Sequence, residues 1–331
     1  MFTCCKKVFT KNTHTKSIPL LTHHMTSIAD RLSRIDAQFR SNSTGILKLP
    51  LSPITSTLIV SSFQQSFQSA KTDSPAKLTK FISSIIDHTN LSPLTTNADI
   101  EKVCEDAAEH QFISICINSS NLQQAKQIFS DKKSDVLLCT VIGFPLGATL
   151  TLAKCAEAKL AIAAGASEID MVINIGKLKS GLYVEVFEDV NSVFEVVRNS
   201  PLPSHAKPGA PWNSTDALIY EHPRLKVILE TGALTNEEII DACLICKAIG
   251  VDFVKTSTGF GYGGAKLEHV KLMKSVVGDS CEIKASGGVK TMEATLSMIE
   301  AGASRIGASS GVAIIASAGQ SQSQSGSEEG Y

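Results

Sequence analysis

The chain has 331 residues, of which 43% are hydrophobic and 19% charged, and its formal net charge is -1. This length allows a large hydrophobic core in one or two domains, while a near-neutral charge without a basic block argues against a nucleic-acid or membrane-surface partner. No run of about 18 apolar residues is present, so the sequence predicts no transmembrane helix and a soluble protein.

The nine cysteines do not form a recognisable framework. Most of them lie inside apolar helix or strand patterns, which is typical of small buried side chains in a reducing compartment. Cys243 and Cys246 have CxxC spacing, but they fall within a helical pattern and no second Cys or His pair accompanies them. We therefore expect no disulfide, no metal site and a cytoplasmic location.

The first 75 residues differ in composition from the rest of the chain. Residues 1–29 contain four lysines and no acidic residue, which resembles an organellar presequence and keeps an organellar location open as an alternative. A short helix is possible from Asp30 to Arg40, and residues 41–75 are rich in Ser, Thr and Gln without a clear period. We expect residues 1–75 to form a flexible extension outside the fold.

From residue 76 to residue 318, apolar strand-like runs alternate with helical patterns. Eight such units over about 245 residues match a (β/α)8 TIM barrel in number and length. A doubly wound sheet usually has a glycine-rich turn after its first strand, and here that run ends in Asp87-His88-Thr89-Asn90. The sequence therefore predicts one catalytic (β/α)8 domain. Its expected strands are Ser84–Thr89, Phe112–Asn118, Leu137–Phe144, Glu168–Asn174, Leu225–Thr231, Phe253–Ser257, Cys281–Ser286 and Arg305–Ser309.

Capping motifs mark the starts of two helices. Thr96 with Asp99 and Thr235 with Glu238 have the spacing of a capping box, in which each side chain accepts a hydrogen bond from the backbone of the other residue. Apolar residues at helical spacing follow both motifs, and Gly250 is positioned to end the second helix. Further helices are expected over Ala148–Ala164 and Glu293–Ala301.

Two segments depart from the repeating pattern. Residues 199–224 are rich in proline and contain the only tryptophan, Trp212, so we expect an irregular surface insertion there. Residues 319–331 are rich in Gln, Ser and Gly and are expected to form a flexible tail that ends in Tyr331. An extended tail of this length reaches roughly 40 Å, so the Tyr331 phenol can reach the mouth of the barrel.

Two lysines occupy strand patterns in which apolar side chains are expected. Lys255 and Lys284 each lie near the carboxyl end of a strand, and small residues and glycine follow each of them. Desolvation and a like-charged neighbour both favour the neutral amine, which is the form that attacks a carbonyl. Two unit charges about 4 Å apart at an effective dielectric of about 20 repel by roughly 4 kcal/mol. We predict that Lys255 forms a Schiff base and that Lys284 activates it; the alternative is that both lysines only anchor an anion.

Other polar residues are selected by their position at the carboxyl ends of strands, where functional groups gather in this fold. Strand alternation puts Asp170 on the same face as Val172 and Asn174. A buried carboxylate there needs a cation, and Lys284 is available. The remaining candidates for substrate binding at strand ends are Asp87, Thr89, Cys116 and Glu230.

Two loops of small residues follow strands seven and eight, at Ser286-Gly287-Gly288 and Gly307-Ala308-Ser309-Ser310-Gly311. Small residues let backbone N–H groups converge on an oxyanion, and the amino end of a helix adds a favourable partial charge. Phosphate sites at this place are frequent in (β/α)8 barrels. The sequence therefore predicts a phosphorylated small-molecule substrate.

Taken together, these residues resemble the deoxyribose-phosphate aldolase family of class I aldolases, over about residues 76–318. The resemblance depends on the combination of motifs in this order and spacing. The motifs are Ile86-Asp87-His88-Thr89, Ile115-Cys116-Ile117, Gly143-Phe144-Pro145-Leu146-Gly147, Glu168-Ile169-Asp170-Met171-Val172, Leu229-Glu230-Thr231-Gly232, Val254-Lys255-Thr256-Ser257-Thr258-Gly259-Phe260 and Lys284-Ala285-Ser286-Gly287-Gly288.

The resemblance implies reversible cleavage of 2-deoxy-D-ribose 5-phosphate to acetaldehyde and D-glyceraldehyde 3-phosphate, in deoxyribonucleotide catabolism. It implies that Lys255 forms the Schiff base while Lys284, Asp170 and a water transfer protons, without a metal or cofactor, because the protonated imine is the electron sink. Some members assist enamine protonation with a C-terminal tyrosine, for which Tyr331 is the counterpart. A homo-oligomer, dimer or tetramer, is also expected. The implied phosphate-binding residues are Gly259, Gly287, Gly288, Ser309 and Ser310.

Two other functions stay open at this point. One is a different Schiff-base aldolase that acts on another phosphorylated sugar, because the donor pocket cannot be sized from sequence. The other is a non-catalytic phosphosugar-binding barrel in which Lys255 and Lys284 only neutralise the phosphate.

Overall fold

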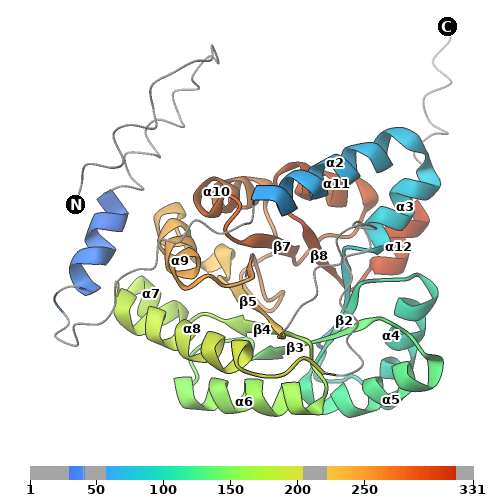
Figure 1. The fold of residues 1–331 in the computed structure, drawn as a ribbon, viewed down its shortest axis with the longest axis horizontal. Helices are drawn as coiled ribbons and strands as arrows, with labels where there is room; N and C mark the ends of the chain where they lie inside the picture. The colour runs from blue at the N-terminus through green and yellow to red at the C-terminus, as the bar shows by residue number, and fades with distance from the viewer. Residues whose placement is uncertain (1–29, 40, 42–56, 204–221, 318–331) are drawn as a thin grey trace, which may run out of the picture.

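The computed structural model describes residues 30–39, 41, 57–203 and 222–317. Eight parallel strands form a closed barrel in which each strand pairs with its neighbours along the chain and β8 pairs with β1 (Figure 1). The predicted (β/α)8 barrel is confirmed. The strands are β1 (Ile86–Asn90), β2 (Ser114–Ile117), β3 (Leu137–Ile142), β4 (Glu168–Val172), β5 (Arg224–Ile228), β6 (Phe253–Lys255), β7 (Glu282–Ser286) and β8 (Arg305–Ala308).

The predicted strands are all present, and most of them end earlier than expected. β4, for example, ends at Val172 because the side chain of Asn174 accepts a hydrogen bond from the backbone N–H of Lys177 at 3.1 Å and caps the next helix. Polar residues at the strand ends thus belong to the loops. The strand pattern in the sequence does not distinguish them from residues of the strand.

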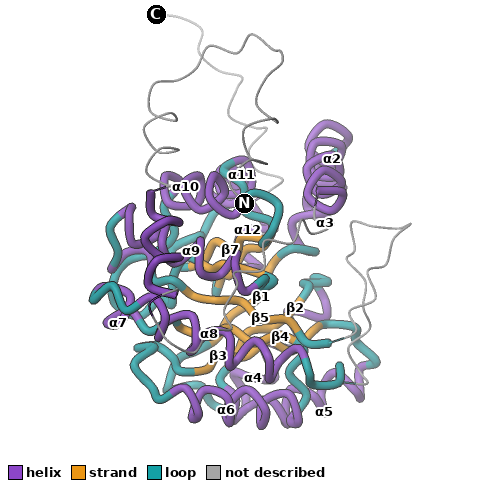
Figure 2. Tube along the Cα trace, turned by 60° about the vertical axis from the view of Figure 1, so that its left-hand side comes forward, coloured by secondary structure: helices purple, strands orange, loops and turns teal. Residues whose placement is uncertain are grey.

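The helices lie outside the barrel, so that Figure 2 shows the strands within a ring of helical segments. Both predicted capping boxes are present, Thr96 with Asp99 at α4 and Thr235 with Glu238 at α9. Gly250 ends α9 with a φ of 84°. The helices are α2 (Thr57–Asp73), α3 (Pro75–Ser83), α4 (Asn97–Glu109), α5 (Leu122–Lys132), α6 (Thr151–Ala164), α7 (Ile175–Lys179), α8 (Tyr183–Arg198), α9 (Asn236–Ile249), α10 (Leu267–Val277), α11 (Met292–Glu300) and α12 (Gly311–Ala316), with short 3-10 turns η1 (Ser119–Asn121) and η2 (Thr231–Ala233).

The loop before α6 is longer than predicted, because this helix begins at Thr151 and not at Ala148. Gly147 has a φ of 70°, and a Cβ at this position would lie 2.0 Å from the carbonyl oxygen of Ile173. Only glycine allows this close approach of two backbones. Residues 143–150 are therefore held against the end of β4 as a loop.

The core has two parts that differ in chemistry. Between the strands and the helices lies one continuous apolar cluster. The interior of the barrel is mainly ionic instead, since Asp87, Glu168, Lys226 and Arg305 point inward and are at most 2% exposed. In most (β/α)8 barrels branched apolar residues fill this space, and buried charges are tolerated only when they pair with one another.

The expected flexible extension over residues 1–75 needs correction in two places. The first is α2, which packs on α3 through aromatic side chains: the ring of Phe81 lies 5.4 Å from that of Phe63 and 5.7 Å from that of Phe67. Phe63, Phe67 and Ala70 are buried, at helical spacing. Among the described side chains of α2, at residues 63–73, these three apolar residues are separated by Ser and Gln, so their helical period is weak in this part of the sequence.

The second is the helix at residues 30–39, in the region where a short helix was considered possible. Its Arg31 Nη1 lies 2.9 and 2.7 Å from the two carboxylate oxygens of Asp241 on α9. Ile35 and Phe39 are buried, and the ring of Phe39 meets that of Phe187 on α8 edge-on. This helix therefore packs on the outside of the barrel domain. Tyr331 and residues 204–221 of the expected insertion lie outside the described residues.

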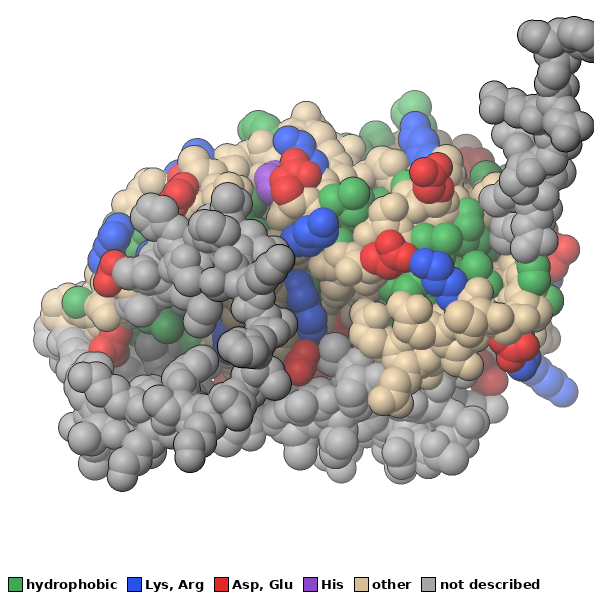
Figure 3. Space-filling model, turned by 90° about the horizontal axis from the view of Figure 1, so that it is seen from above, with side chains coloured by type: hydrophobic (Ala, Val, Ile, Leu, Met, Phe, Trp, Pro, Cys, Tyr) green, Lys and Arg blue, Asp and Glu red, His purple; other side chains and the backbone are tan. Residues whose placement is uncertain are grey.

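The described surface has mixed charge. On the face formed by α2, α10 and α11, acidic and basic side chains are interspersed (Figure 3), and Lys71 of α2 forms an ion pair with Glu300 of α11. Among the described residues, no helix is long and apolar enough to cross a membrane.

Candidate active site

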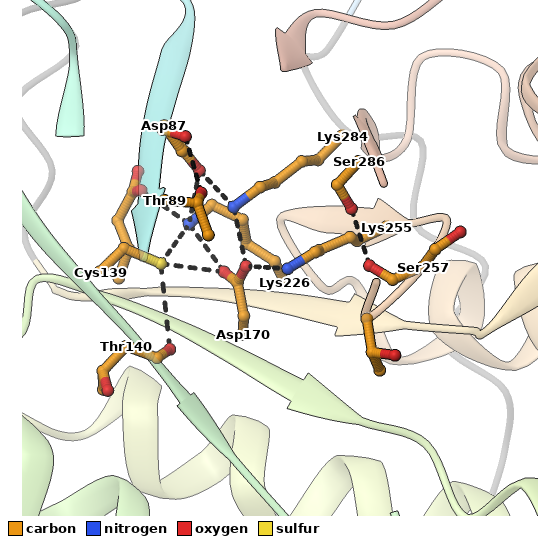
Figure 4. A network of polar contacts seen from close by, with 12 residues as sticks. Asp87, Thr89, Cys139, Thr140, Asp170, Lys226, Lys255, Ser257, Lys284 and Ser286 are labelled. Carbon is orange, nitrogen blue, oxygen red and sulfur yellow. Dashed lines mark hydrogen bonds and ion pairs between the residues drawn. The ribbon is translucent and has the colours of Figure 1, made fainter. Parts of the chain in front are cut away.

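The two lysines singled out from the sequence come together inside the barrel. Lys255 and Lys284 are register partners on β6 and β7. Both amines point inward to the same atom, Asp170 Oδ2, with Nζ–O distances of 2.7 Å from Lys255 and 2.8 Å from Lys284 (Figure 4). The structure thus brings the three residues together, with a carboxylate between the two amines. The sequence argument paired Asp170 with Lys284 alone, and the structure shows that the same carboxylate oxygen also contacts Lys255.

Asp170 is held from its other side as well. Its Oδ1 accepts hydrogen bonds from Lys226 Nζ at 3.0 Å and from Cys139 Sγ at 3.1 Å. Burial alone would raise the pKa of Asp170, but the surrounding lysines outweigh burial and hold the pKa well below its usual value. Asp170 is therefore an anion with a fixed orientation.

A second layer of ion pairs lies beneath Asp170. Lys226 Nζ is 2.6 Å from Glu168, and Arg305 Nη1 is 2.7 Å from Asp87 and 3.0 Å from Glu168. Asp87 also pairs with Lys284. Burial by itself would lower the pKa of Lys284, but Asp170 and Asp87 raise it well above its usual value. Lys284 is therefore cationic at neutral pH.

The connected ion pairs have an uneven charge balance. Among the described residues they join four basic groups, Lys226, Lys255, Lys284 and Arg305, to three carboxylates, Asp87, Glu168 and Asp170. When all seven are ionised, the cluster carries one excess positive charge, and excess charge is costly in a dry interior. Loss of one proton from a basic group would make the cluster neutral.

Lys255 is the basic group with the fewest electrostatic contacts. It pairs with one carboxylate, whereas Lys284 pairs with Asp87 and Asp170, and Arg305 with Asp87 and Glu168. Lys255 also lines the cavity at the barrel mouth. The amine with the fewest carboxylate partners is thus the one that an entering carbonyl compound meets.

The cavity at the carboxyl ends of the strands has a volume of about 390 Å³. Its floor includes Lys255, and its walls include several predicted substrate-binding residues, in the loops after β1, β6, β7 and β8. Gly287 approaches its neighbours so closely that a Cβ would lie 2.9 Å from the Cα of Gly264. This close approach of two backbones therefore requires a residue without a side chain at position 287. The predicted residues that line the cavity are Thr89, Gly259, Gly287, Gly288 and Ser309.

The other predicted residues lie behind the cavity wall. Asp87 belongs to the ion-pair layer, and Cys116 packs in a small apolar cluster with Leu91, Val141 and Phe144. Glu230 Oε2 accepts hydrogen bonds from the backbone N–H and the hydroxyl of Thr258. It therefore supports the loop after β6. Ser310 precedes α12 and is not among the lining residues, and Tyr331 lies outside the described residues.

Sequence reasoning missed four interior residues and part of the cavity wall, which includes Lys290. Lys226 and Arg305 are basic residues within apolar strands, which is the same signal that identified Lys255. Glu168 is two positions before Asp170 and shares its face. Cys139 carried no signal, since a thiol in a strand is usually a plain core residue. Lys290, which lines the cavity, follows the Gly-Gly loop after β7.

Two groups of potential metal ligands meet in the barrel. The first is Cys116, Cys139 and Asp170, and the second is Asp87, Cys139 and Glu168. Lys226 Nζ lies within the second group, 3.3 Å from Cys139 Sγ and 2.6 Å from Glu168, and takes the position of a cation. The first group faces the amines of Lys255 and Lys284 across Asp170, and these positive charges oppose a metal ion there.

A larger hollow, of about 560 Å³, lies between α2 and α3, with Asp73, Lys77 and Phe81 in its lining. It is bordered by exposed polar side chains and lacks a buried ionisable cluster among the described residues. We therefore assign the chemistry to the smaller cavity above Lys255.

The structure is a (β/α)8 barrel in which two inward lysines share one carboxylate. These features allow the chain to be compared with known proteins. A family model described as DeoC/LacD family aldolase matches residues 81–317. The chain belongs to this family of aldolases.

Similar proteins align with most of the chain. A deoxyribose-phosphate aldolase from Thermococcus gammatolerans is 49% identical over 234 residues, which are 71% of this chain and 95% of the relative. One from Carboxydothermus hydrogenoformans is 48% identical over 71% of this chain and 93% of the relative.

Solved structures agree with this assignment. A putative deoxyribose-phosphate aldolase from Coccidioides immitis has a TM-score of 0.63 and 35% identity, covering 79% of this chain and 98% of that chain. A deoxyribose phosphate aldolase from Aeropyrum pernix, described as a unique tetrameric structure, has a TM-score of 0.62 and 26% identity, covering 77% of this chain and 96% of that chain.

Proposed function

We propose that this chain is a class I aldolase that reversibly cleaves 2-deoxy-D-ribose 5-phosphate to acetaldehyde and D-glyceraldehyde 3-phosphate, in deoxyribose phosphate catabolism. The observation that supports this most directly is the position of the Lys255 amine, which contacts Asp170 at 2.7 Å and borders the cavity. The named activity of the relatives supplies the substrate.

Lys255 is the proposed nucleophile. Its neutral amine attacks the substrate carbonyl to form a carbinolamine, and loss of water gives a protonated imine. This imine carries a positive charge at the position of the former ammonium, so that Asp170 pairs with it as it paired with Lys255. The imine accepts the electron pair of the breaking carbon–carbon bond and becomes an enamine.

Lys284 and Asp170 are the proposed proton carriers. Both groups lie at the Lys255 amine, since Lys284 Nζ is 2.8 Å from the Asp170 oxygen that Lys255 contacts. Loss of water from the carbinolamine requires an acid, and protonation of the enamine requires a proton donor. We propose that Lys284 supplies these protons through a water and that Asp170 holds the two amines in position.

The phosphate of the substrate is proposed to bind at the loops after β6, β7 and β8, at the far end of the cavity. Their small residues leave backbone N–H groups accessible to an oxyanion. Lys290, which lines the same cavity, adds a positive charge. The residues proposed for this contact are Gly259, Gly287, Gly288, Ser309 and Ser310, with Thr89 on the sugar.

Asp87, Cys116 and Glu230 are proposed to support the site rather than to touch the substrate. We also propose that the chain acts in the cytoplasm and assembles into a homo-oligomer. The described tetramer of the similar Aeropyrum pernix chain supports assembly.

Borohydride trapping tests the proposal against its two alternatives. With acetaldehyde, reduction should add a two-carbon group to Lys255 alone, located by peptide mass spectrometry. Cleavage of deoxyribose 5-phosphate in a chelator-containing buffer then identifies the substrate. An adduct without this cleavage would favour an aldolase for another phosphorylated sugar, and no adduct would favour a non-catalytic phosphosugar-binding barrel.

A further inference from the structure

Two cysteine thiols meet beside the active-site carboxylate. Cys116 on β2 and Cys139 on β3 are register partners on neighbouring strands, and both side chains are fully buried. Their Sγ atoms and a carboxylate oxygen of Asp170 all lie within 4.8 Å of one another. The proposed cleavage reaction uses neither thiol as a nucleophile, so this pair of thiols has no assigned chemistry.

The backbone geometry allows a disulfide between the two residues. Paired residues of neighbouring strands have Cα atoms about 4.8 Å apart, which lies within the range of roughly 4.4 to 6.8 Å that a disulfide spans. Cys139 Sγ points into the barrel toward Asp170 (Figure 4), and the Sγ atom of Cys116 lies near the same carboxylate. A bond between the sulfur atoms therefore requires rotation of the side chains and not a movement of the strands.

The two thiols differ in acidity. The hydrogen bond with Cys139 and the positive charge of Lys284 lower the pKa of the Cys116 thiol, although burial alone would raise it. Burial, together with the neighbouring Cys116 and Asp170, raises the pKa of Cys139 well above its usual value. Cys116 is therefore the thiol with more thiolate character, which is the form that peroxides oxidise. Cys139 is then the neighbouring thiol that can react with the oxidised sulfur.

A small oxidant can approach Cys116 from the cavity. Leu91 lines the cavity and belongs to the same apolar cluster as Cys116, together with Val141 and the half-buried Phe144. Cys116 thus lies behind apolar side chains of the cavity wall. Hydrogen peroxide is close to water in size, so small movements of Leu91 or Phe144 are enough to admit it. A phosphosugar bound above Lys255 blocks this route.

We propose that Cys116 and Cys139 are a site of reversible oxidation, at which a hydroperoxide converts the two thiols to a disulfide that lowers the activity of the enzyme. Cys116 attacks the O–O bond of hydrogen peroxide, which gives a sulfenic acid and releases one water. The sulfur of Cys139 then attacks the sulfur of Cys116, and the hydroxyl leaves as a second water with the proton of Cys139. Two thiols are thus oxidised to one disulfide while one peroxide is reduced to two waters.

The disulfide changes the surroundings of Asp170. In the reduced protein, Cys139 Sγ donates a hydrogen bond to Asp170 Oδ1 at 3.1 Å. A disulfide has no proton to donate, so the carboxylate loses a donor on the side opposite to the active-site amines. Its negative charge then acts more strongly on Lys255, whose Nζ lies 2.7 Å from Asp170 Oδ2. This disfavours the neutral amine that attacks a carbonyl.

The CxxC pair of α9 has a different environment. Burial raises the pKa of Cys243 and of Cys246 well above the usual value. Both therefore stay protonated, and we expect neither to react under conditions that oxidise Cys116. This pair is an internal reference for the selectivity of the oxidation.

Peptide mapping of the full chain tests the site. After treatment with hydrogen peroxide, the remaining thiols are alkylated and the chain is digested with trypsin, which cleaves between the two cysteines after Lys126. We expect a disulfide that links the peptides of Cys116 and Cys139. Cleavage of deoxyribose 5-phosphate should fall by about 10-fold, as for loss of one hydrogen bond to a buried charge, and dithiothreitol should restore it.

The effect on Lys255 has its own readout. Trapping of the imine with cyanoborohydride, which leaves disulfides intact, should require a higher pH in the oxidised protein than in the reduced protein. Deoxyribose 5-phosphate present during the peroxide treatment should slow formation of the disulfide, because it occupies the cavity.

Two variants isolate the reacting thiol. Cys116→Ser should keep, after peroxide, the activity that the same variant had before treatment. Cys155→Ser is the matched control, since Cys155 on α6 is the described cysteine that is not fully buried. It should be inactivated by peroxide as the wild type is. Equal inactivation of Cys116→Ser and the wild type would overturn the role of Cys116.

The outcomes separate this inference from the proposed function, on which only the loss of activity rests. A wild type that does not cleave deoxyribose 5-phosphate before treatment would contradict the proposed function, and the peptide map would still test the disulfide. Oxidation of other cysteines without a link between Cys116 and Cys139 would overturn the site. A linked protein with full activity and an unshifted trapping profile would overturn its effect through Asp170.

Discussion

Lys226 lies 3.0 Å from Asp170 Oδ1, on the side of the carboxylate opposite to the two active-site amines. It therefore orients Asp170 from below without reaching the cavity. Lys226 also supplies the fourth basic charge of the interior cluster, so that its removal changes both the position of Asp170 and the charge balance.

We expect Lys226→Met to impair chemistry more than substrate binding. Without Lys226, the remaining three basic groups balance the three carboxylates only while Lys255 stays protonated, so borohydride trapping at Lys255 should require a higher pH than in the wild type. The loss of a buried partner should also cost about 3 to 5 kcal/mol of unfolding free energy. Trapping efficiency measured against pH, with Lys126→Met at an exposed position of α5 as the control, checks this. An unshifted profile in a folded variant would contradict the charge argument.

Lys255→Arg should abolish turnover while it preserves the fold. An arginine keeps a positive charge beside Asp170 but has no amine that can form an imine at neutral pH. We expect the cleavage rate to fall by about 10,000-fold or more, with a thermal midpoint close to that of the wild type and no borohydride adduct. Residual trapping at another lysine in this variant would show that the nucleophile has been misassigned.

Acid should destabilise the protein through the interior carboxylates. Burial alone would raise the pKa of Asp87, but Lys284, Arg305 and Lys226 outweigh it and hold the pKa below its usual value of 3.8. The unfolded chain therefore binds this proton first as the pH falls. The stability from Asp87 is present above about pH 4 and is lost as the pH falls further.

Urea unfolding of the wild type and of Asp87→Asn between pH 3 and pH 6 measures this effect. The variant should be less stable at pH 6 but should lose less unfolding free energy on acidification. Parallel curves for the two proteins would mean that Asp87 does not carry the acid dependence.

The ion pair beneath α6 should contribute strongly to stability. Lys154→Met removes the cation from the buried carboxylate of Asp189 and leaves it the hydrogen bond from the hydroxyl of Thr151, and we expect a loss of about 3 to 5 kcal/mol. Lys126→Met, at an exposed position of α5, is the control and should leave the unfolding free energy nearly unchanged. A loss of equal size in both variants would mean that the buried ion pair contributes no more to the unfolding free energy than an exposed lysine does.

Tyr331→Phe examines the role that the family resemblance implies for the C-terminal residue. If the phenol assists protonation of the enamine, exchange of acetaldehyde methyl protons with deuterated solvent should slow, while borohydride trapping at Lys255 stays normal, because imine formation precedes that step. Equal exchange rates in the two proteins would remove Tyr331 from the active site.

Local sequence patterns were sufficient to predict most of the strands and helices of the barrel. The capping boxes at Thr96 and Thr235 depend on residues only three positions apart, and the strands depend on short apolar runs, so both are legible without tertiary information. Helix α2 was missed and the helix at residues 30–39 was expected only as possible, because the described side chains of each include two or three buried apolar residues among polar ones. Such short faces are stabilised by the surface that they cover and not by their own propensity.

The sequence by itself determined that lysines stand near the carboxyl ends of β6 and β7, beside small residues, and this identified the location of the site. Only the tertiary structure decided that Asp170 lies between the two amines and that Lys226, Arg305 and Glu168 complete the ion-pair cluster. It also decided that α6 turns Lys154 inward and its leucines outward. The physical reason is that barrel closure brings together strands far apart in the chain, and the cost of burying an unpaired charge then selects which side chains face one another.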